Sequence, residues 1–87
     1  MIYLASYDAH KVRDYTRVYE LLSKLGAVRL LLSSWPVRGS FSAEQLRDAV
    51  RQAMDGDDSV AVIEVAPGAQ WATVNVQPPA NQVLAAN

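Results

Sequence analysis

The sequence predicts a small α+β domain, and three observations support this prediction. The chain has 87 residues, of which 51% are hydrophobic, and this is enough for one domain with a modest core. Two segments repeat apolar residues at spacings of three and four, as amphipathic helices do. Several shorter segments are rich in aliphatic and aromatic residues and end at turn-forming residues, as strands do.

The first half of the chain predicts a strand, a helix and a second strand. Residues 2–7 are apolar on both alternating faces, which fits a strand that is covered on both sides. A helix follows, with Asp14 as its N-cap and Gly26 just beyond its C-terminal end. Residues 28–35 predict the second strand, which Pro36 interrupts, and residues 37–41 predict a short returning strand or a loop. The buried stripe of the helix would consist of Tyr15, Val18, Leu22 and Leu25.

The second half predicts another helix and two more strands. Ser42 and Gln45 are spaced as a capping box, so a helix should begin there and run to about Met54. Residues 60–65 are strongly apolar and predict a strand bounded by turns. Residues 70–76 alternate in polarity and predict a last strand.

The predicted order is β-α-β-β-α-β with an additional C-terminal strand, which is a ferredoxin-like sandwich. We assign residues 1–77 to this single domain and residues 78–87 to a C-terminal tail that is mobile or packs on a dimer partner. Both helices would cover one face of the sheet. The other face would expose apolar side chains of the first and fourth strands, so we expect a second copy to cover it in a homodimer.

The residue counts exclude several kinds of site. The chain has no cysteine, which removes disulfides, thiolate zinc sites and cysteine nucleophiles. The single histidine, His10, excludes a two-histidine metal site within one chain, and it fits an ordinary surface residue better than a general base. The net charge of −1 argues against a general polyanion binder. The charge is uneven, because residues 1–40 carry six basic and three acidic residues and residues 41–87 carry two basic and six acidic residues.

Asp8 directly follows the first predicted strand and is the best candidate for chemistry. One carboxylate is a poor site for Mg²⁺, which requires oxygen ligands in near-octahedral geometry. Two Asp8 residues related by a dimer axis could hold one ion between them, with water and phosphate oxygens completing its coordination. The simpler alternative is that the Asp8 carboxylate caps the loop that follows.

Basic residues in the first half could form a strip that contacts phosphates. The alternative is a solvated helix face, because the chain has no net positive charge. Trp35 and Trp71 are expected to anchor the core or a dimer interface rather than to stack on bases. The strip would consist of Lys11, Arg13, Arg17, Arg29 and Arg38.

Several short segments resemble a known family in their order and spacing. The most specific is Ser6-Tyr7-Asp8 at the end of the first strand. Over roughly residues 2–65 the chain resembles the small CRISPR-associated Cas-two family, and its acidic composition is closer to the SinR-like relatives of that family. The VapD-type toxin ribonucleases, a related branch, are a further alternative. The other matching segments are Leu25-Gly26-Ala27, Ser33-Ser34-Trp35, Ser42 and Asp57-Asp58-Ser59-Val60.

This resemblance implies a ferredoxin-like homodimer in which residues 70–76 cross to extend the sheet of the other copy. It implies that Asp8 matches the metal-binding acid of the family and that Ser34 matches a serine near the end of the second strand. Some members of the family are described as metal-dependent nucleases. Others are structural adaptors that hold the CRISPR integrase and its DNA.

The leading functional prediction is a homodimer that binds or cleaves nucleic acid with a divalent metal. Asp8 would be both catalytic and metal-binding, with Mg²⁺ shared between two copies, and no other cofactor is expected. One alternative is a non-catalytic dimeric assembly or adaptor module that docks a partner protein, and another is a small-ligand regulatory domain that uses the dimer cleft. We expect a cytoplasmic protein, because no apolar run approaches the ~20 residues of a membrane-spanning helix. The expected nucleic-acid contacts are Arg13, Arg17, Arg29 and Ser34.

Overall fold

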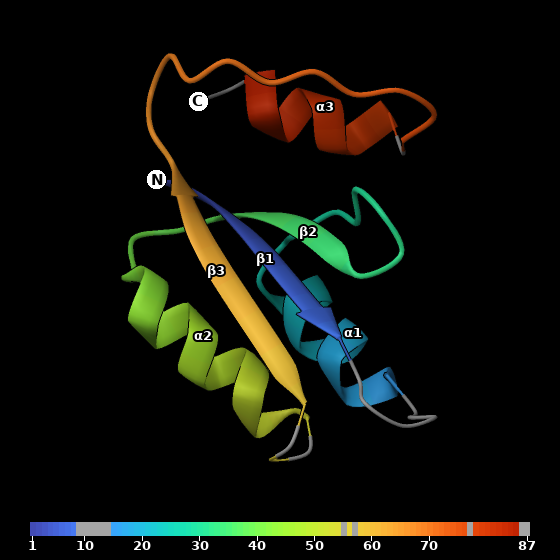
Figure 1. Cartoon of the computed structure of the whole chain (residues 1–87), viewed down its shortest axis with the longest axis vertical. Helices are drawn as coiled ribbons and strands as arrows, with labels where there is room; N and C mark the ends of the chain where they lie inside the picture. The colour runs from blue at the N-terminus through green and yellow to red at the C-terminus, as the bar shows by residue number, and fades with distance from the viewer. Residues whose placement is uncertain (9–14, 55, 57, 77, 86–87) are drawn as a thin grey trace.

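The computed structural model describes residues 1–8, 15–54, 56, 58–76 and 78–85. It has the predicted α+β class, and its strands and helices alternate along the chain (Figure 1). None of the described helices is long and apolar enough to cross a membrane. In chain order the elements are β1 (Ile2–Asp8), α1 (Thr16–Lys24), β2 (Ser34–Arg38), α2 (Ala43–Gln52), β3 (Ser59–Val65) and α3 (Pro78–Ala85).

The three strands form one antiparallel sheet in the order β2-β1-β3, so β1 is central and the other two strands are edges. In the central strand, Tyr3 lies opposite Val37 of β2 and Glu64 of β3. Because side chains alternate along a strand, residues of β1 with odd numbers share one face and those with even numbers share the other. The two faces are covered unequally, because Ile63, which lies opposite Leu4 on the face of the even-numbered residues, is 63% exposed.

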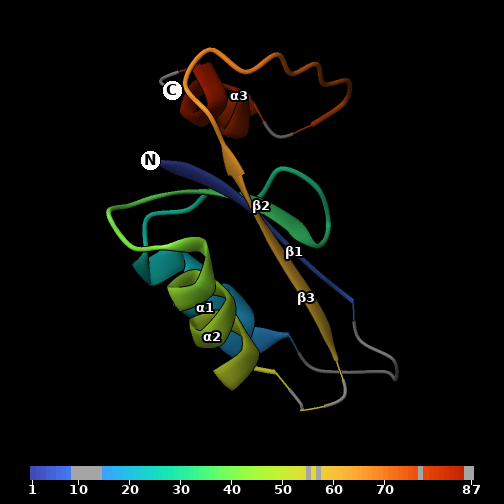
Figure 2. The same ribbon diagram turned by 60° about the vertical axis from the view of Figure 1, so that its left-hand side comes forward.

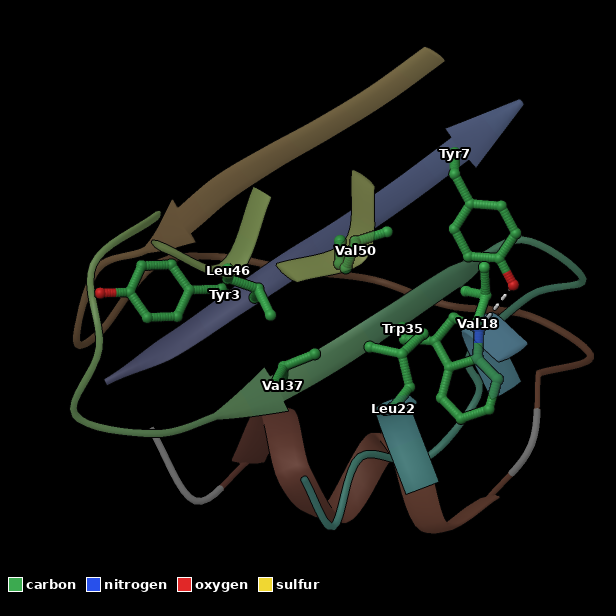
Figure 3. Packing of buried hydrophobic residues seen from close by; sticks show 9 residues of the cluster. Tyr3, Tyr7, Val18, Leu22, Trp35, Val37, Leu46 and Val50 are labelled. Atoms are coloured by element: carbon green, nitrogen blue, oxygen red, sulfur yellow. Dashed lines mark hydrogen bonds between the residues drawn. The ribbon is translucent and has the colours of Figure 1, made fainter. Parts of the chain in front are cut away.

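Helices α1 and α2 lie on one face of the sheet and close the hydrophobic core (Figure 2). α1 buries Val18 and Leu22, and α2 buries Leu46 and Val50 (Figure 3). Each large apolar side chain buried in this way contributes about 1.5–3 kcal/mol, so this layer holds the domain together. The strands contribute Tyr3, Ala5, Tyr7, Trp35 and Val37.

The ends of the two core helices follow the sequence closely. The Gln45 N–H donates to the Ser42 Oγ at 3.1 Å, and the Ser42 N–H donates to the Gln45 Oε1 at 2.8 Å, which confirms the capping box. At the end of α1, Gly26 has a φ of 73°, and the Ala27 N–H donates to the Leu22 carbonyl at 3.0 Å. This is a Schellman ending, so the predicted role of Gly26 is confirmed. Asp14, the predicted N-cap, lies outside the described residues.

The strand predicted over residues 28–35, with a short returning strand or a loop over 37–41, differs from the structure. Residues 28–33 contain only an isolated bridge between Leu31 and Ser34, and β2 begins at Ser34 and runs through Pro36. The apolar run misled the prediction, since the Leu32 side chain is 77% exposed. Pro36 is tolerated because β2 is an edge strand, where a missing outward N–H breaks no ladder hydrogen bond.

The C-terminal region also differs from the prediction. Residues 70–76 form no strand, and Pro78–Ala85 form α3 where the sequence analysis expects a tail. α3 lies against β2, away from α1 and α2 (Figures 1 and 2), and buries Ala80 and Leu84. The first residues of α3 are prolines, which suit a first helical turn because its N–H groups have no intrahelical acceptor. The described residues therefore give a three-stranded sheet rather than the five strands of the predicted order.

Candidate functional site

Asp8 and Ser34 meet at one end of the sheet. Asp8 is the exposed last residue of β1, and the Ser34 hydroxyl lies 3.0 Å from the Ser6 hydroxyl in a hydrogen bond. Both residues line an open depression of about 340 Å³, together with Ser33 and Ser59. Among the described residues, none that lines the depression is basic.

The metal prediction for Asp8 receives no support from neighbouring ligands. Over the described ranges, no group of three or more His, Cys, Asp or Glu side chains could hold a metal ion. A single carboxylate with serine hydroxyls is a weak site for Mg²⁺. A shared Mg²⁺ would depend on a second copy that brings its own Asp8 close, and this stays a prediction.

Three residues of the predicted basic strip, Arg17, Arg29 and Arg38, lie among the described residues. Arg17 is exposed on α1, whereas Arg29 lies beside an aromatic ring. The Arg29 guanidinium lies 5.5 Å from the centroid of Tyr19, and its Nη1 donates to the Tyr19 hydroxyl at 3.5 Å. Arg13, Lys11 and His10 lie outside the described residues.

Four aromatic side chains of the described residues form a cluster. The rings of Tyr7 and Tyr15 are 5.3 Å apart, those of Tyr15 and Tyr19 are 6.0 Å apart, and those of Tyr19 and Trp35 are 5.7 Å apart. The Trp35 Nε1–H donates to the Tyr7 hydroxyl at 3.1 Å (Figure 3). Burial raises the pKa of Tyr7 to about 12, and the Trp35 hydrogen bond offsets part of this rise.

Tyr7 and Trp35 belong to the buried core, and Tyr15 and Tyr19 pack against it. The core role predicted for Trp35 is confirmed. Trp71 is 42% exposed and lies outside the core, so a core role for it is wrong. An interface role for Trp71 stays a prediction.

The two edges of the sheet present different backbone groups. The Tyr7 N–H donates to the Ser33 carbonyl at 3.1 Å, and the Gly39 N–H donates to the Met1 carbonyl at 3.0 Å. Hydrogen-bonding direction alternates along an antiparallel strand, so every second residue of β2 bonds toward β1. The residues of β2 whose backbone groups point away from β1 are Ser34, Pro36 and Arg38.

The outer edge of β2 is closed. The Ser34 N–H donates to the Leu31 carbonyl at 3.3 Å, and the Ser34 carbonyl accepts hydrogen bonds from Leu30 and Leu31. Pro36 has no N–H to offer, and α3 lies against the same strand. A further strand has little to pair with at this edge.

The outer edge of β3 is open. On β1, Leu4 and Ser6 do not bond toward β2, so the alternation directs their backbone groups to Ile63 and Ala61 of β3. The β3 residues that alternate with Ala61 and Ile63 direct their backbone N–H and C=O groups away from β1. In the part of the chain that the structure describes, no strand lies beyond β3. The outward-pointing residues are Val60, Val62 and Glu64.

Comparison with known proteins identifies the family. Residues 9–66, two-thirds of the chain, match the family described as "Protein of unknown function (DUF982)". The chain belongs to this family. No curated protein and no solved structure matches the chain.

Membership of the DUF982 family corrects the predicted resemblance to the Cas-two and SinR-like proteins, which is wrong. Nothing in the comparisons points to those families. The Ser6-Tyr7-Asp8 block, the most specific segment of the resemblance, lies before residue 9, where the family match begins. An acid after an apolar strand is common, since a carboxylate readily accepts hydrogen bonds from the loop that follows. The roles carried over from that resemblance therefore lose their basis.

Sequence reasoning missed the open edge of β3 and the position of α3. The edge follows from which strands are neighbours, and strand order cannot be read from residues 60–65 themselves. For α3 there was a signal, because Ala80 and Leu84 are spaced four residues apart after two prolines.

Proposed function

We propose that this DUF982 protein is a non-catalytic homodimeric assembly module, in which two copies pair through the outer edges of β3. The observation that supports this proposal is the row of outward backbone groups of Val60, Val62 and Glu64 at an edge that no described strand covers. An uncovered apolar edge is a template for another strand, and natural proteins usually block such edges or use them.

A second copy is a suitable occupant of this edge because an antiparallel strand pair is symmetric about a two-fold axis. Pairing centred on Val62 sets each Val62 opposite its own counterpart, so the two residues exchange both of their backbone hydrogen bonds. The same register sets Glu64 of each copy opposite Val60 of the other. Like charges therefore do not face each other across the axis.

The arrangement of the sheet also supports the proposal that the domain is ferredoxin-like. The order β2-β1-β3, with α1 and α2 on one face, is the split βαβ pattern without its outermost strand. The isolated bridge between Leu31 and Ser34 lies where that strand would begin to pair with β2. In the proposed dimer, the two sheets join into one continuous sheet with the β2 edges outermost.

The proposed dimer is not compatible with Mg²⁺ shared by two Asp8 residues. Asp8 is on β1, so the two copies of β1 would be separated by three strand spacings, or about 14 Å. Oxygen ligands of Mg²⁺ lie about 2.1 Å from the ion, and side chains stand perpendicular to the sheet rather than across it. The assembly proposal and the shared-metal prediction therefore exclude each other in this geometry.

The test is the mass of the protein in solution, with two variants at one position. We expect the wild-type chain to have twice its 9.5 kDa monomer mass in sedimentation equilibrium. Val62→Pro removes an outward N–H and leaves the bonds to β1 intact, so this variant should be a monomer. Val62→Ala loses the same valine contacts but keeps the N–H, and it should remain a dimer.

Circular dichroism of both variants checks that the domain is folded. If Val62→Pro does not fold, the pair Glu64→Pro and Glu64→Ala makes the same comparison at an exposed side chain. A wild-type monomer at all concentrations would overturn the proposal, and so would folded proline variants that remain dimers.

A further inference from the structure

A groove with two arginines runs between α3 and the edge of the sheet. It consists of two adjoining hollows of about 470 and 410 Å³, which share Val28 and Pro79. Volumes of this size are typical of small-molecule sites. The groove is far from the outer edge of β3, because β2 and β3 are opposite edges of the sheet. Its occupancy is therefore independent of the proposed dimer.

The larger hollow has an aromatic and apolar wall. Tyr19 and Trp35 line it with their rings 5.7 Å apart, and Pro79 of α3 lines it as well. Trp35 is buried, and its indole N–H is already bonded to Tyr7. This wall offers ring faces and edges rather than polar groups, which suits a flat hydrocarbon or aromatic group.

The charge of the groove is one-sided. Arg29 lines the larger hollow and Arg38 lines the smaller one, and none of the described residues that line either hollow is acidic. Within the described ranges, no carboxylate forms an ion pair with Arg29 or Arg38. A guanidinium has five N–H donors, and the contact with Tyr19 uses one of those on Arg29.

The Arg29 side chain contacts Tyr19. Its guanidinium lies over the Tyr19 ring at a cation–π distance, and both residues line the larger hollow. A planar guanidinium held in place binds a carboxylate through two parallel hydrogen bonds, and less side-chain entropy is lost when it does so. The hollow therefore combines an anion-binding group with an aromatic wall.

We propose that this groove binds a small aromatic carboxylate. The carboxylate pairs with Arg29, and the ring packs against the surface that Tyr19, Trp35 and Pro79 line. Contact with Pro79 explains how such a ligand would also stabilise α3, which buries only Ala80 and Leu84 against the rest of the domain.

Phenylacetate is the probe that tests this proposal, with phenylacetamide as its neutral analogue. Both are titrated to about 10 mM into the ¹⁵N-labelled full chain, which detects dissociation constants near 1 mM. We expect phenylacetate to shift the indole N–H signal of Trp35 and the amide signals of Val28 and Arg29. The indole signal of Trp71 should not move, because Trp71 lines neither hollow.

Two variants separate the role of Arg29 from general charge. Arg29→Gln should weaken phenylacetate binding about tenfold or more, which is the usual loss for one charge-assisted contact. Arg51→Gln makes the same charge change on an exposed face of α2 and should leave the affinity unchanged. Equal binding of phenylacetate and phenylacetamide to the wild-type chain would overturn the proposal, as would the absence of any shift at Trp35. The comparison of the two probes needs no variant, so it decides the matter if Arg29→Gln does not fold.

Discussion

The two edges of this small sheet are built in opposite ways. On β2, the outward groups of Ser34 are bonded to Leu30 and Leu31, Pro36 has no N–H, and α3 lies alongside. On β3, Val60, Val62 and Glu64 direct their backbone groups to an edge that no described strand covers. The contrast teaches that a sheet can specify one pairing surface by blocking the other, so a closed edge is part of how partners are selected.

The largest expected effect comes from moving a proline by one residue along β3. Ile63 directs its N–H toward β1, so Ile63→Pro should unfold the domain, whereas Val62→Pro should keep it folded. The Leu4 carbonyl would lose its donor in Ile63→Pro, which alone costs about 1–3 kcal/mol. The Ile63 side chain is 63% exposed, so lost packing adds little. Urea unfolding of the two variants measures the difference, and equal stabilities would show that the assigned bonding directions are wrong.

Opening the closed edge should have the next largest effect. Pro36→Val places a new N–H on the outer edge of β2 with a side chain of similar size. Two open edges per chain allow pairing to continue in both directions, so this variant should form species larger than a dimer. Light scattering over a range of concentrations checks this. A Pro36→Val protein with the wild-type mass would mean that the bonded groups of Ser34 and the packing of α3 are enough to block this edge.

The smallest expected effect is the change in stability with pH that comes from Tyr7, whose hydroxyl accepts a hydrogen bond from Trp35 of β2. Because the pKa of Tyr7 is raised to about 12 in the folded chain, the unfolded chain ionises first, near pH 10. The stability from the neutral phenol is complete below pH 10 and is lost as the pH rises toward 12. Chemical denaturation from pH 9 to 12 should show this loss, and Tyr7→Phe should remove it. A loss of the same size in Tyr7→Phe would assign it to other groups.

The elements that the sequence predicts well are those with local signals. The capping box at Ser42, the Schellman ending at Gly26 and the apolar runs that became β1 and β3 all depend on neighbours within a few residues. The predicted helices agree with α1 and α2 for the same reason. Packing over the sheet then buries the stripes that the spacing predicts.

The predictions that fail depend on tertiary position. Leu30, Leu31 and Leu32 have the composition of a strand. The chain turns there instead, and the backbone N–H groups of Leu30 and Leu31 donate hydrogen bonds to the Ser34 carbonyl. Residues 70–76 alternate well, yet they form no strand in the structure. The short α3 has few strong helix formers and is stabilised by packing on β2, so helix propensity alone underestimates its tendency to form.

The candidate site depends even more on tertiary position. The sequence places Asp8 at the end of a strand, which is confirmed, but the role assigned to it came from a family resemblance that is wrong. The open edge of β3 results from strand order, and the groove beside Arg29 results from where α3 packs. Neither follows from residue spacing.

Amide hydrogen exchange at β3, followed as a function of protein concentration, tests the open edge most directly. The inward N–H groups of Ala61 and Ile63 should be protected at every concentration, because they bond to β1. The outward N–H groups of Val60, Val62 and Glu64 should exchange quickly in dilute protein and slowly once the dimer forms. Fast exchange of these three amides at concentrations where the protein is a dimer would contradict pairing through β3.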